Sequence, residues 1–437
     1  MKYFITILLL FTKLTGFTKE DPFNTRDYIL ALKNVTDVMV NDVTSPVAAG
    51  RYYAYITLTA RETAAKFKKE NTYSFTGKLN GFTGTQTDAA LIQQSNYSFA
   101  VIFSIYKMSE KLLPSGYLLV KKQDSLITIA QKRGLLAKTI DASKELVNNI
   151  VKQVQDYVRQ DRFNKLSGLK KYTPLDGDGY WRPTGPGYMA ALEPNWNTLR
   201  TFILDSCQQF KPLPAAAFDT ATSSSFFKQV KDVYETGKKL TKEQKNIANF
   251  WDCNPFALQQ LGHIEFGLKK ISPGGHWIGI TGIVCNKARI SLQQTAFIHS
   301  IVAITLADAF ISCWDEKYRS NRIRPETAIK KWLDPYWRPF LQTPPFPEYT
   351  SGHSVISTSV AIVLTHFFGD NFEFTDNTEN EFGLPSRKFK SFLQAASEAA
   401  ISRFYGGIHY KDAIDNGVLQ GKAIGKHVIA KLMLERI

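Results

Sequence analysis

Three short segments in the last third of the chain constrain its fold, because together they carry the groups of a single binding site. They are residues 317–325 (KYRSNRIRP), 350–353 (TSGH) and 402–409 (SRFYGGIH). A buried tetrahedral oxyanion such as phosphate or vanadate requires several cations and hydrogen-bond donors around it. One lysine, two arginines, a Ser-Gly turn and two histidines from these segments meet that requirement. We therefore predict a fold that brings the three segments to one oxyanion.

The spacing of the cations indicates how they reach this site. Lys317 and Arg324 are seven residues apart, close to two helical turns, so we expect both on one helix face. Pro325 disfavours helical backbone at the residue before it, which places Arg324 at a helix end. The guanidinium groups of Arg324 and Arg403 can each bond two oxygens, whereas Lys317 provides a compact point charge.

The second and third segments add donors and two histidines. Ser351 and the backbone amide of Gly352 can donate to the anion, and glycine lets the backbone approach closely. One of His353 and His409 can bond to the central atom or attack it, while the other moves protons. The glycines at 406–407 should end a helix and let the chain turn, so that Arg403 and His409 point into one pocket.

These segments resemble the signature of a superfamily that unites vanadium-dependent haloperoxidases with type 2 phosphatidic acid phosphatases and bacterial acid phosphatases. Its pattern is Lys-x6-Arg-Pro, then Pro-Ser-Gly-His, then Ser-Arg-x5-His-x3-Asp. The small acid phosphatases have little chain before the first motif, whereas 316 residues precede Lys317 here. In this respect the chain most resembles the secreted bacterial vanadium haloperoxidases of iodoperoxidase type. The resemblance implies an all-α fold of helical bundles of the vanadium haloperoxidase and acid phosphatase type.

The resemblance also implies a role for each residue of the site. His409 would be the metal ligand that holds vanadate in a peroxidase, or the phosphoryl-accepting nucleophile in a phosphatase. His353 would be the acid–base residue, and Lys317 would polarise bound peroxide, which makes these three the catalytic set. The oxyanion would be held by five residues: Lys317, Arg324, Ser351, Gly352 and Arg403.

The implied cofactor is vanadate, and the implied substrates are hydrogen peroxide and a halide, with iodide or bromide favoured. Trp314 and Phe346 stand where iodide-oxidising members carry aromatic residues beside the vanadate, although ordinary core packing would also explain them. Two other functions stay open. One is a soluble acid phosphatase that forms a phosphohistidine intermediate without a cofactor, and the other is a catalytically silent oxyanion-binding protein.

Two positions depart from the family pattern. Thr350 replaces the usual proline, a change that we expect to alter only the turn. Ala413 occupies the place of the final aspartate, which in the phosphatases is thought to orient the nucleophilic histidine. Asp412, one residue earlier, is the candidate substitute.

The N-terminus predicts export. A basic start is followed by a short apolar run at residues 4–11, a pattern typical of a secretory signal peptide. A buried N-terminal strand or helix is the alternative. We expect a signal peptide at residues 1–18, an N-terminal helical region at 19–240 and a catalytic helical bundle at 241–437. The protein would then be periplasmic or secreted.

The remaining sequence predicts helices. Apolar residues follow helical spacing from 141 to 166, and Thr241 and Gln244 form a plausible capping box before the apolar run at 247–251. The apolar stretches at 296–307 and 355–368 are too short to span a bilayer, so we expect core helices and no stable membrane insertion.

Charge and cysteines exclude several other classes of protein. The net charge is +15, but the lysines are spread among acidic residues and no nucleic-acid-binding motif occurs, so we expect no nucleic-acid partner. Four cysteines are too few and too scattered for a disulfide scaffold or a zinc site. Members of the family often form dimers, which leaves a homodimer open.

Overall fold

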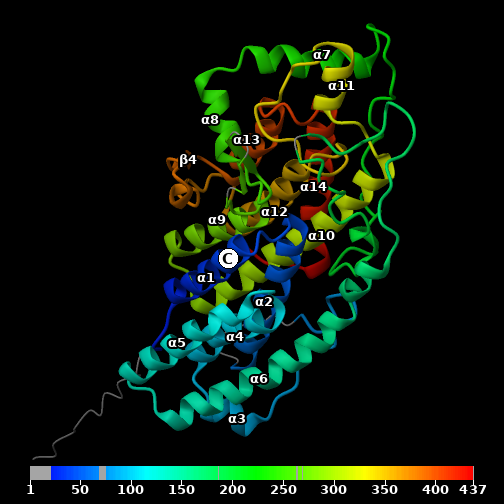
Figure 1. Ribbon diagram of the computed structural model, residues 1–437. Helices are drawn as coiled ribbons and strands as arrows, with labels where there is room; N and C mark the ends of the chain where they lie inside the picture. The colour runs from blue at the N-terminus through cyan, green and yellow to red at the C-terminus, as the bar shows by residue number, and fades with distance from the viewer. Residues whose placement is uncertain (1–20, 68–74, 186, 262–263, 268, 437) are drawn as a thin grey trace, which may run out of the picture.

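Helices dominate the fold. In the computed structural model the described residues are 21–67, 75–185, 187–261, 264–267 and 269–436. Within these ranges strands form only two small antiparallel sheets of two strands each (Figure 1). The all-α fold predicted from the sequence is therefore confirmed. Residues 1–18, expected to form a signal peptide, lie outside the described residues.

The first half of the described chain forms the following helices: α1 (Thr25–Asn41), α2 (Pro46–Lys66), α3 (Ala89–Gln94), α4 (Tyr97–Leu112), η1 (Gly116–Leu119), α5 (Val120–Lys132), α6 (Ala137–Arg159), η2 (Phe163–Gly168), η3 (Trp196–Thr198) and α7 (Ser225–Lys238), where η denotes a 3-10 helix. The second half forms α8 (Lys242–Phe250), β1 (Leu258–Leu261), β2 (Ile264–Gly267), α9 (Pro273–Lys287), α10 (Leu292–Ser320), α11 (Pro325–Trp332), α12 (Gly352–Phe368), β3 (Phe374–Asp376), η4 (Asn380–Phe382), β4 (Arg387–Phe389), α13 (Phe392–Tyr405) and α14 (Lys411–Leu432).

Helix α10 lies at the centre of the fold. It packs against α2 from the N-terminal half and against α12 from the C-terminal half (Figure 1). Helix α12 in turn packs against α13 and α14. A hydrophobic core therefore extends from Phe23 to Leu434. The domain boundary expected near residue 240 falls in the connection between α7 and α8, and it stays a prediction.

The most apolar helices are core helices. By length and composition α10 could cross a membrane, but 94% of an apolar stretch of 18 residues within it is buried inside the protein. Helix α12 is shorter, and most of its side chains are buried as well. The two apolar stretches of the sequence thus pack in the interior, as expected.

Two local predictions have different outcomes. The capping box is present, because the Thr241 side chain accepts from the Gln244 amide while the Gln244 side chain accepts from the Thr241 amide. The single helix expected over 141–166 is wrong at its end. Helix α6 stops at Arg159, and Arg162 adopts a left-handed conformation with φ of 71°, so the chain continues as the separate 3-10 helix η2.

Close packing of α14 on α12 brings the second and third segments together. A Cβ atom added at Gly421 would lie 2.3 Å from the Val355 carbonyl oxygen, so only glycine allows this approach. At the start of both helices the Ser351 amide donates to the Ala413 carbonyl at 3.0 Å. The beginning of α12 is thereby fixed next to the beginning of α14.

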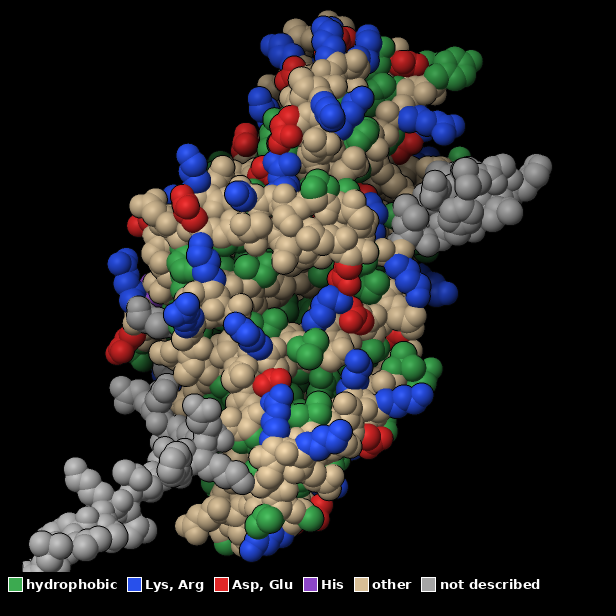
Figure 2. Space-filling model, turned by 90° about the vertical axis from the view of Figure 1, so that its left-hand side faces the viewer, with side chains coloured by type: hydrophobic (Ala, Val, Ile, Leu, Met, Phe, Trp, Pro, Cys, Tyr) green, Lys and Arg blue, Asp and Glu red, His purple; other side chains and the backbone are tan. Residues whose placement is uncertain are grey.

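The surface charge is dispersed. Figure 2 shows one face of the molecule, on which lysine and arginine side chains lie scattered among aspartates and glutamates. On this face the distribution agrees with the sequence, in which the lysines are spread among acidic residues.

Candidate active site

Helix ends meet at the candidate site. Lys317 lies in the last turn of α10, and Arg324 is the N-cap of α11. Ser351 is the N-cap of α12, Arg403 lies in the last turn of α13, and His409 directly precedes the N-cap of α14. These side chains are buried, with exposed fractions of 0–3%. The structure thus brings the three segments of the sequence together.

Lys317 and Arg324 do not share a helix, so that prediction was wrong. Helix α10 ends at Ser320, and the C-cap residue Asn321 adopts the left-handed conformation with φ of 49°. Asparagine tolerates this conformation, which ends a helix and turns the chain. Arg324 then begins α11, whose first residue is Pro325. Its expected position at a helix end is confirmed.

Lys317 fixes the loop that precedes α12. Its Nζ donates to the backbone carbonyls of Pro347, Glu348 and Thr350 at 3.2, 3.1 and 2.5 Å. Burial lowers the pKa of Lys317 to about 8. The ammonium group therefore holds the backbone of residues 347–350 in place and also brings a positive charge to the site.

Thr350 contributes more than a turn, contrary to the expectation for this departure from the family pattern. Its hydroxyl donates to Oε1 of Gln420 on α14 at 2.8 Å, and its carbonyl accepts from Lys317. Thr350 therefore links α10, α12 and α14 directly beside the site.

Arg324 lies against His409. Its Nη1 donates to the Ile408 carbonyl at 2.8 Å and lies 3.1 Å from Nε2 of His409. Its Nε donates to the Phe346 carbonyl at 2.9 Å. Burial, together with the nearby charge of Arg403, lowers the pKa of Arg324 to about 10.

Glu348 orients His409. Its Oε1 lies 2.8 Å from Nδ1 of His409 and also accepts from the Tyr410 amide at 3.0 Å. We assign the tautomer from these partners: Nδ1–H donates to Glu348, and the Nε2 lone pair faces Arg324. Burial and then the positive charge of Arg324 hold the pKa of His409 well below its usual value. His409 is thus neutral and presents a lone pair.

Asp412, proposed as the residue that orients His409, is linked to it only through two other residues, Arg322 and Glu348. It pairs with Arg322 at 2.5 Å, and Arg322 pairs with Glu348 at 3.2 Å. The sequence-based prediction missed Glu348, which supplies the carboxylate that Ala413 lacks. The sequence feature that could have indicated Glu348 is its position as an acidic residue within the proline-rich stretch 344–349, directly before the second segment.

Two polar atoms at the site are buried without a partner among the described residues. They are Nε of Arg403 and Nε2 of His353. Arg403 is held from its other side, because its Nη1 donates to the Trp251 carbonyl at 3.0 Å. Desolvation and then the Arg403 charge lower the pKa of His353 well below its usual value, so its imidazole is neutral. A bound oxyanion would provide these atoms with partners.

A small cavity of about 40 Å³ lies over these groups. At 10–15 Å³ for each water-sized group it holds about three such groups. It is lined by Pro46, Cys253, Asn254, Phe256, Pro273, Phe310, Trp314, Pro344, Phe346, Gly352, His353, Arg403 and His409. Lys317 and Arg324 are not among these lining residues, so they contribute mainly their positive charge to the cavity.

Trp314 and Phe346 pack together at the wall of the cavity. Their ring centroids are 4.9 Å apart. Nζ of Lys317 and the guanidinium carbon of Arg324 each lie 5.0 Å from the Phe346 ring centroid. The aromatic faces therefore stabilise the two buried cations, and the structure places both residues beside the site, as the resemblance implied.

Known proteins share this architecture. A crystal structure of the first bacterial vanadium-dependent iodoperoxidase is 41% identical in sequence with a TM-score of 0.87, and the match covers 93% of this chain and 96% of that chain. The chain belongs to the vanadium-dependent haloperoxidases. A family model described as the VCPO second helical-bundle domain matches residues 297–435, which contain all three segments.

More distant haloperoxidases share the fold. A holo-type bacterial vanadium-dependent chloroperoxidase is 15% identical with a TM-score of 0.67, over 90% of this chain and 92% of that chain. An apo-type bacterial vanadium-dependent chloroperoxidase is 14% identical with a TM-score of 0.65, over 89% of this chain and 94% of that chain. No curated protein sequence matches the chain. The haloperoxidase recognised from the three segments is thus confirmed at the level of family and fold.

Proposed function

We propose that this protein is a vanadate-dependent peroxidase that oxidises iodide or bromide with hydrogen peroxide to hypohalous acid. The observation that carries the proposal is the state of His409. Its Nδ1 is held by Glu348 at 2.8 Å, so the lone pair lies on Nε2, which accepts from Nη1 of Arg324 at 3.1 Å in this structure and would serve as the metal ligand inside a cationic pocket.

The residues present fit vanadate. Lys317, Arg324 and Arg403 are buried close together, and burial lowers the pKa of each. A multiply charged oxyanion would offset their mutual repulsion. The partnerless atoms of Arg403 and His353, together with the N-terminal amides of α12, would bond its oxygens.

When bound, vanadate would supply a Lewis-acid centre that activates peroxide without changing its own oxidation state. His409 would bind it through Nε2, while the three cations stabilise negative charge on the oxygens. His353 is neutral and lines the cavity, so its Nε2 can accept a proton from incoming hydrogen peroxide and hold it beside the site.

The halide side of the site is apolar. Phe310, Trp314 and Phe346 line the cavity together with prolines. Such a wall gives little hydration to a small anion, and it suits the large, weakly hydrated iodide or bromide. This arrangement supports the halide preference that we propose.

A paired assay on protein without residues 1–18 tests the proposal. One arm adds orthovanadate and measures peroxide-dependent oxidation of iodide and bromide, and the other arm omits vanadate and measures hydrolysis of a chromogenic phosphate ester. We expect halide oxidation that requires vanadate. Hydrolysis that vanadate inhibits, without halide turnover, would contradict the proposal, and so would silence in both arms.

A soluble acid phosphatase is the second candidate, and Glu348 is the observation that favours it. A carboxylate on Nδ1 would raise the nucleophilicity of Nε2, as the missing aspartate is thought to do in the phosphatases. The 41% sequence identity to a bacterial vanadium-dependent iodoperoxidase supports the peroxidase.

We also propose that the protein is exported to the periplasm or secreted. The support is the basic start and the apolar run at residues 4–11. N-terminal sequencing of the mature protein tests this, and we expect it to begin after residue 15. A mature chain that keeps Met1 would contradict export by this route. A homodimer stays a prediction of the family resemblance.

A further inference from the structure

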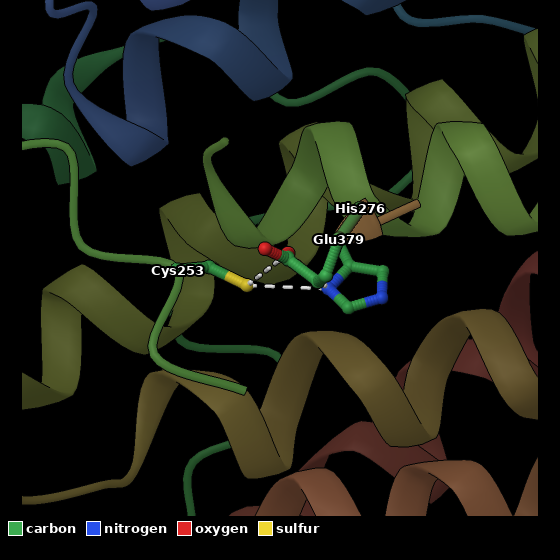
Figure 3. A group of neighbouring side chains, drawn as sticks. All are labelled: Cys253, His276 and Glu379. Carbon is green, nitrogen blue, oxygen red and sulfur yellow. Dashed lines mark hydrogen bonds and ion pairs between the residues drawn. The ribbon is translucent and has the colours of Figure 1, made fainter. Parts of the chain in front are cut away.

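A second cluster of potential metal ligands lies beside the cavity. Cys253, His276 and Glu379 turn their side chains toward one point (Figure 3). All three are buried, with exposed fractions of 3%, 0% and 4%. Their ligand atoms, Sγ, Nδ1 and a carboxylate oxygen, lie within 4.8 Å of one another.

The separations of these atoms match those around a tetrahedral zinc ion. Sγ of Cys253 lies 3.3 Å from Nδ1 of His276 and 3.7 Å from Oε1 of Glu379. Nδ1 of His276 lies 3.2 Å from Oε1 of Glu379. Metal–ligand lengths of 2.0–2.3 Å at tetrahedral angles require separations of about 3.4–3.6 Å. The three atoms therefore need to shift by only a few tenths of an ångström.

The outer contacts of His276 are those of a metal-binding histidine. Its other nitrogen, Nε2, lies 2.7 Å from Oδ2 of the buried Asp376. Asp376 is itself fixed, because the Thr378 amide and hydroxyl donate to its Oδ1 at 3.0 and 2.7 Å. A carboxylate on the distal ring nitrogen sets the tautomer that presents Nδ1 to a metal.

Aromatic packing holds the ring in place. The Trp251 ring stacks on the His276 ring with centroids 4.6 Å apart and an interplanar angle of 18°. Phe250 contacts the same ring edge-on at 5.4 Å. His276 is thus restrained by packing on its faces and by a carboxylate at its tip, and the cluster is rigid before any ligand binds.

The cluster was hidden in the sequence. Cys253 and Glu379 are 126 residues apart, and His276 lies on α9 between them. No short motif connects the three residues, and the sequence-based argument against a zinc site considered only the spacing of cysteines. The fold alone brings them together.

We propose that Cys253, His276 and Glu379 form a site for a divalent transition metal, with zinc the best match to a thiolate, imidazole and carboxylate set. Binding would release the thiol proton of Cys253 and any proton on Nδ1 of His276 to solvent. The thiolate and carboxylate then neutralise the charge of the dication. A water molecule would complete the coordination.

The site would support the oxyanion pocket. Cys253 also lines the small cavity, which gives an ion a route to the cluster. The same segment carries the Trp251 carbonyl that accepts from Arg403. A metal at Cys253 would therefore fix the backbone that positions one of the three cations.

Metal analysis of vanadate-free protein tests the proposal. The chain is dialysed against chelator, mixed with excess zinc, passed through gel filtration and measured for zinc by mass spectrometry. We expect one zinc per chain in the wild type, at least a tenfold loss of affinity in Cys253→Ser and Glu379→Gln, and no change in the matched control Cys207→Ser. Circular dichroism confirms that each variant is folded.

Cobalt provides a measurement that depends on the ligands themselves. Cobalt(II) added to the wild type should produce a thiolate-to-metal charge-transfer absorption that zinc displaces and that Cys253→Ser lacks. Failure of the wild type to retain zinc would overturn the proposal and would leave a buried hydrogen-bonded cluster. Zinc retained equally by Cys253→Ser, or cobalt bound without the thiolate band, would overturn it as well. None of these results depends on halide oxidation.

Discussion

Glu348→Gln is the sharpest perturbation of the proposed vanadate site. Glutamine keeps the shape of the side chain and an oxygen that can accept from Nδ1 of His409, but it removes the negative charge. In the wild type the carboxylate accepts from His409 at 2.8 Å and from the Tyr410 amide at 3.0 Å. The substitution therefore tests the charge of this contact rather than its presence.

The expected loss is about tenfold in vanadate affinity. A hydrogen bond to a charged group contributes about 1.5–3 kcal/mol and a neutral one about 0.5–1.5 kcal/mol, so the midpoints differ by about 1.3 kcal/mol, which is close to tenfold. Removal of a negative charge also makes the pocket more attractive to an anion. That gain is small, because Arg322 already pairs with Glu348 at 3.2 Å.

The pH dependence makes the prediction specific. Burial raises the pKa of Glu348 to about 7. As the pH falls through 7 the carboxylate gains a proton, its bond to His409 becomes a neutral one, and the wild type approaches the variant. The affinity ratio of wild type to Glu348→Gln should rise from about two at pH 6 toward about ten at pH 9.

Vanadate titrations of both proteins between pH 6 and 9 measure this ratio, by calorimetry or by retained vanadium. The speciation of free vanadate affects both proteins equally and cancels in the ratio. A ratio that stays near one at every pH would refute the role of Glu348. A constant ratio of ten would refute its titration near pH 7.

Three further predictions concern single residues. His353→Gln should lower vanadate affinity by no more than about tenfold, the cost of one neutral hydrogen bond. At saturating vanadate it should lower halide turnover by about 10²–10⁴-fold, because the neutral imidazole moves protons; equal turnover in the two proteins would contradict this. Burial lowers the pKa of Lys317 to about 8, so the ratio of vanadate affinity between the wild type and Lys317→Met should fall above pH 8, where the lysine loses its charge; a ratio that does not change with pH would contradict this. Ser351→Ala removes the N-cap side chain of α12 and should lower the free energy of unfolding by about 0.5–2 kcal/mol, measured by chemical denaturation. An unchanged free energy of unfolding would contradict the role of this cap.

The sequence predicted the meeting of the three segments because the chemistry of an oxyanion demands it. Lys317, Arg324, Ser351, Arg403 and His409 all come together, although they arise from different helix ends. The sequence also predicted that the stretch 296–307 is buried in the core, although the complete helix α10 is long enough to cross a membrane and only its burial in the fold identifies it as a core helix. These conclusions rest on charge, polarity and length, which are local properties of the chain.

Contacts between distant segments of the chain could not be predicted from such local properties. Glu348 reaches His409 across 61 residues, and nothing in its own neighbourhood specifies that partner. The end of α10 depended on Asn321 adopting a left-handed conformation, which competes with the helical spacing of Lys317 and Arg324. Asp412 directly precedes Ala413, which occupies the position of the family aspartate, but its side chain pairs with Arg322 and not with His409.

The most direct test of the proposed function is iodide oxidation measured against bound vanadium. Vanadate-free protein is loaded with increasing orthovanadate, freed of excess by gel filtration, and measured for vanadium content and peroxide-dependent iodide oxidation in the same fractions. We predict that activity rises in proportion to bound vanadium and saturates at one vanadium per chain, and that His409→Ala retains neither. Activity without bound vanadium, or full activity and vanadium content in His409→Ala, would contradict the proposed site.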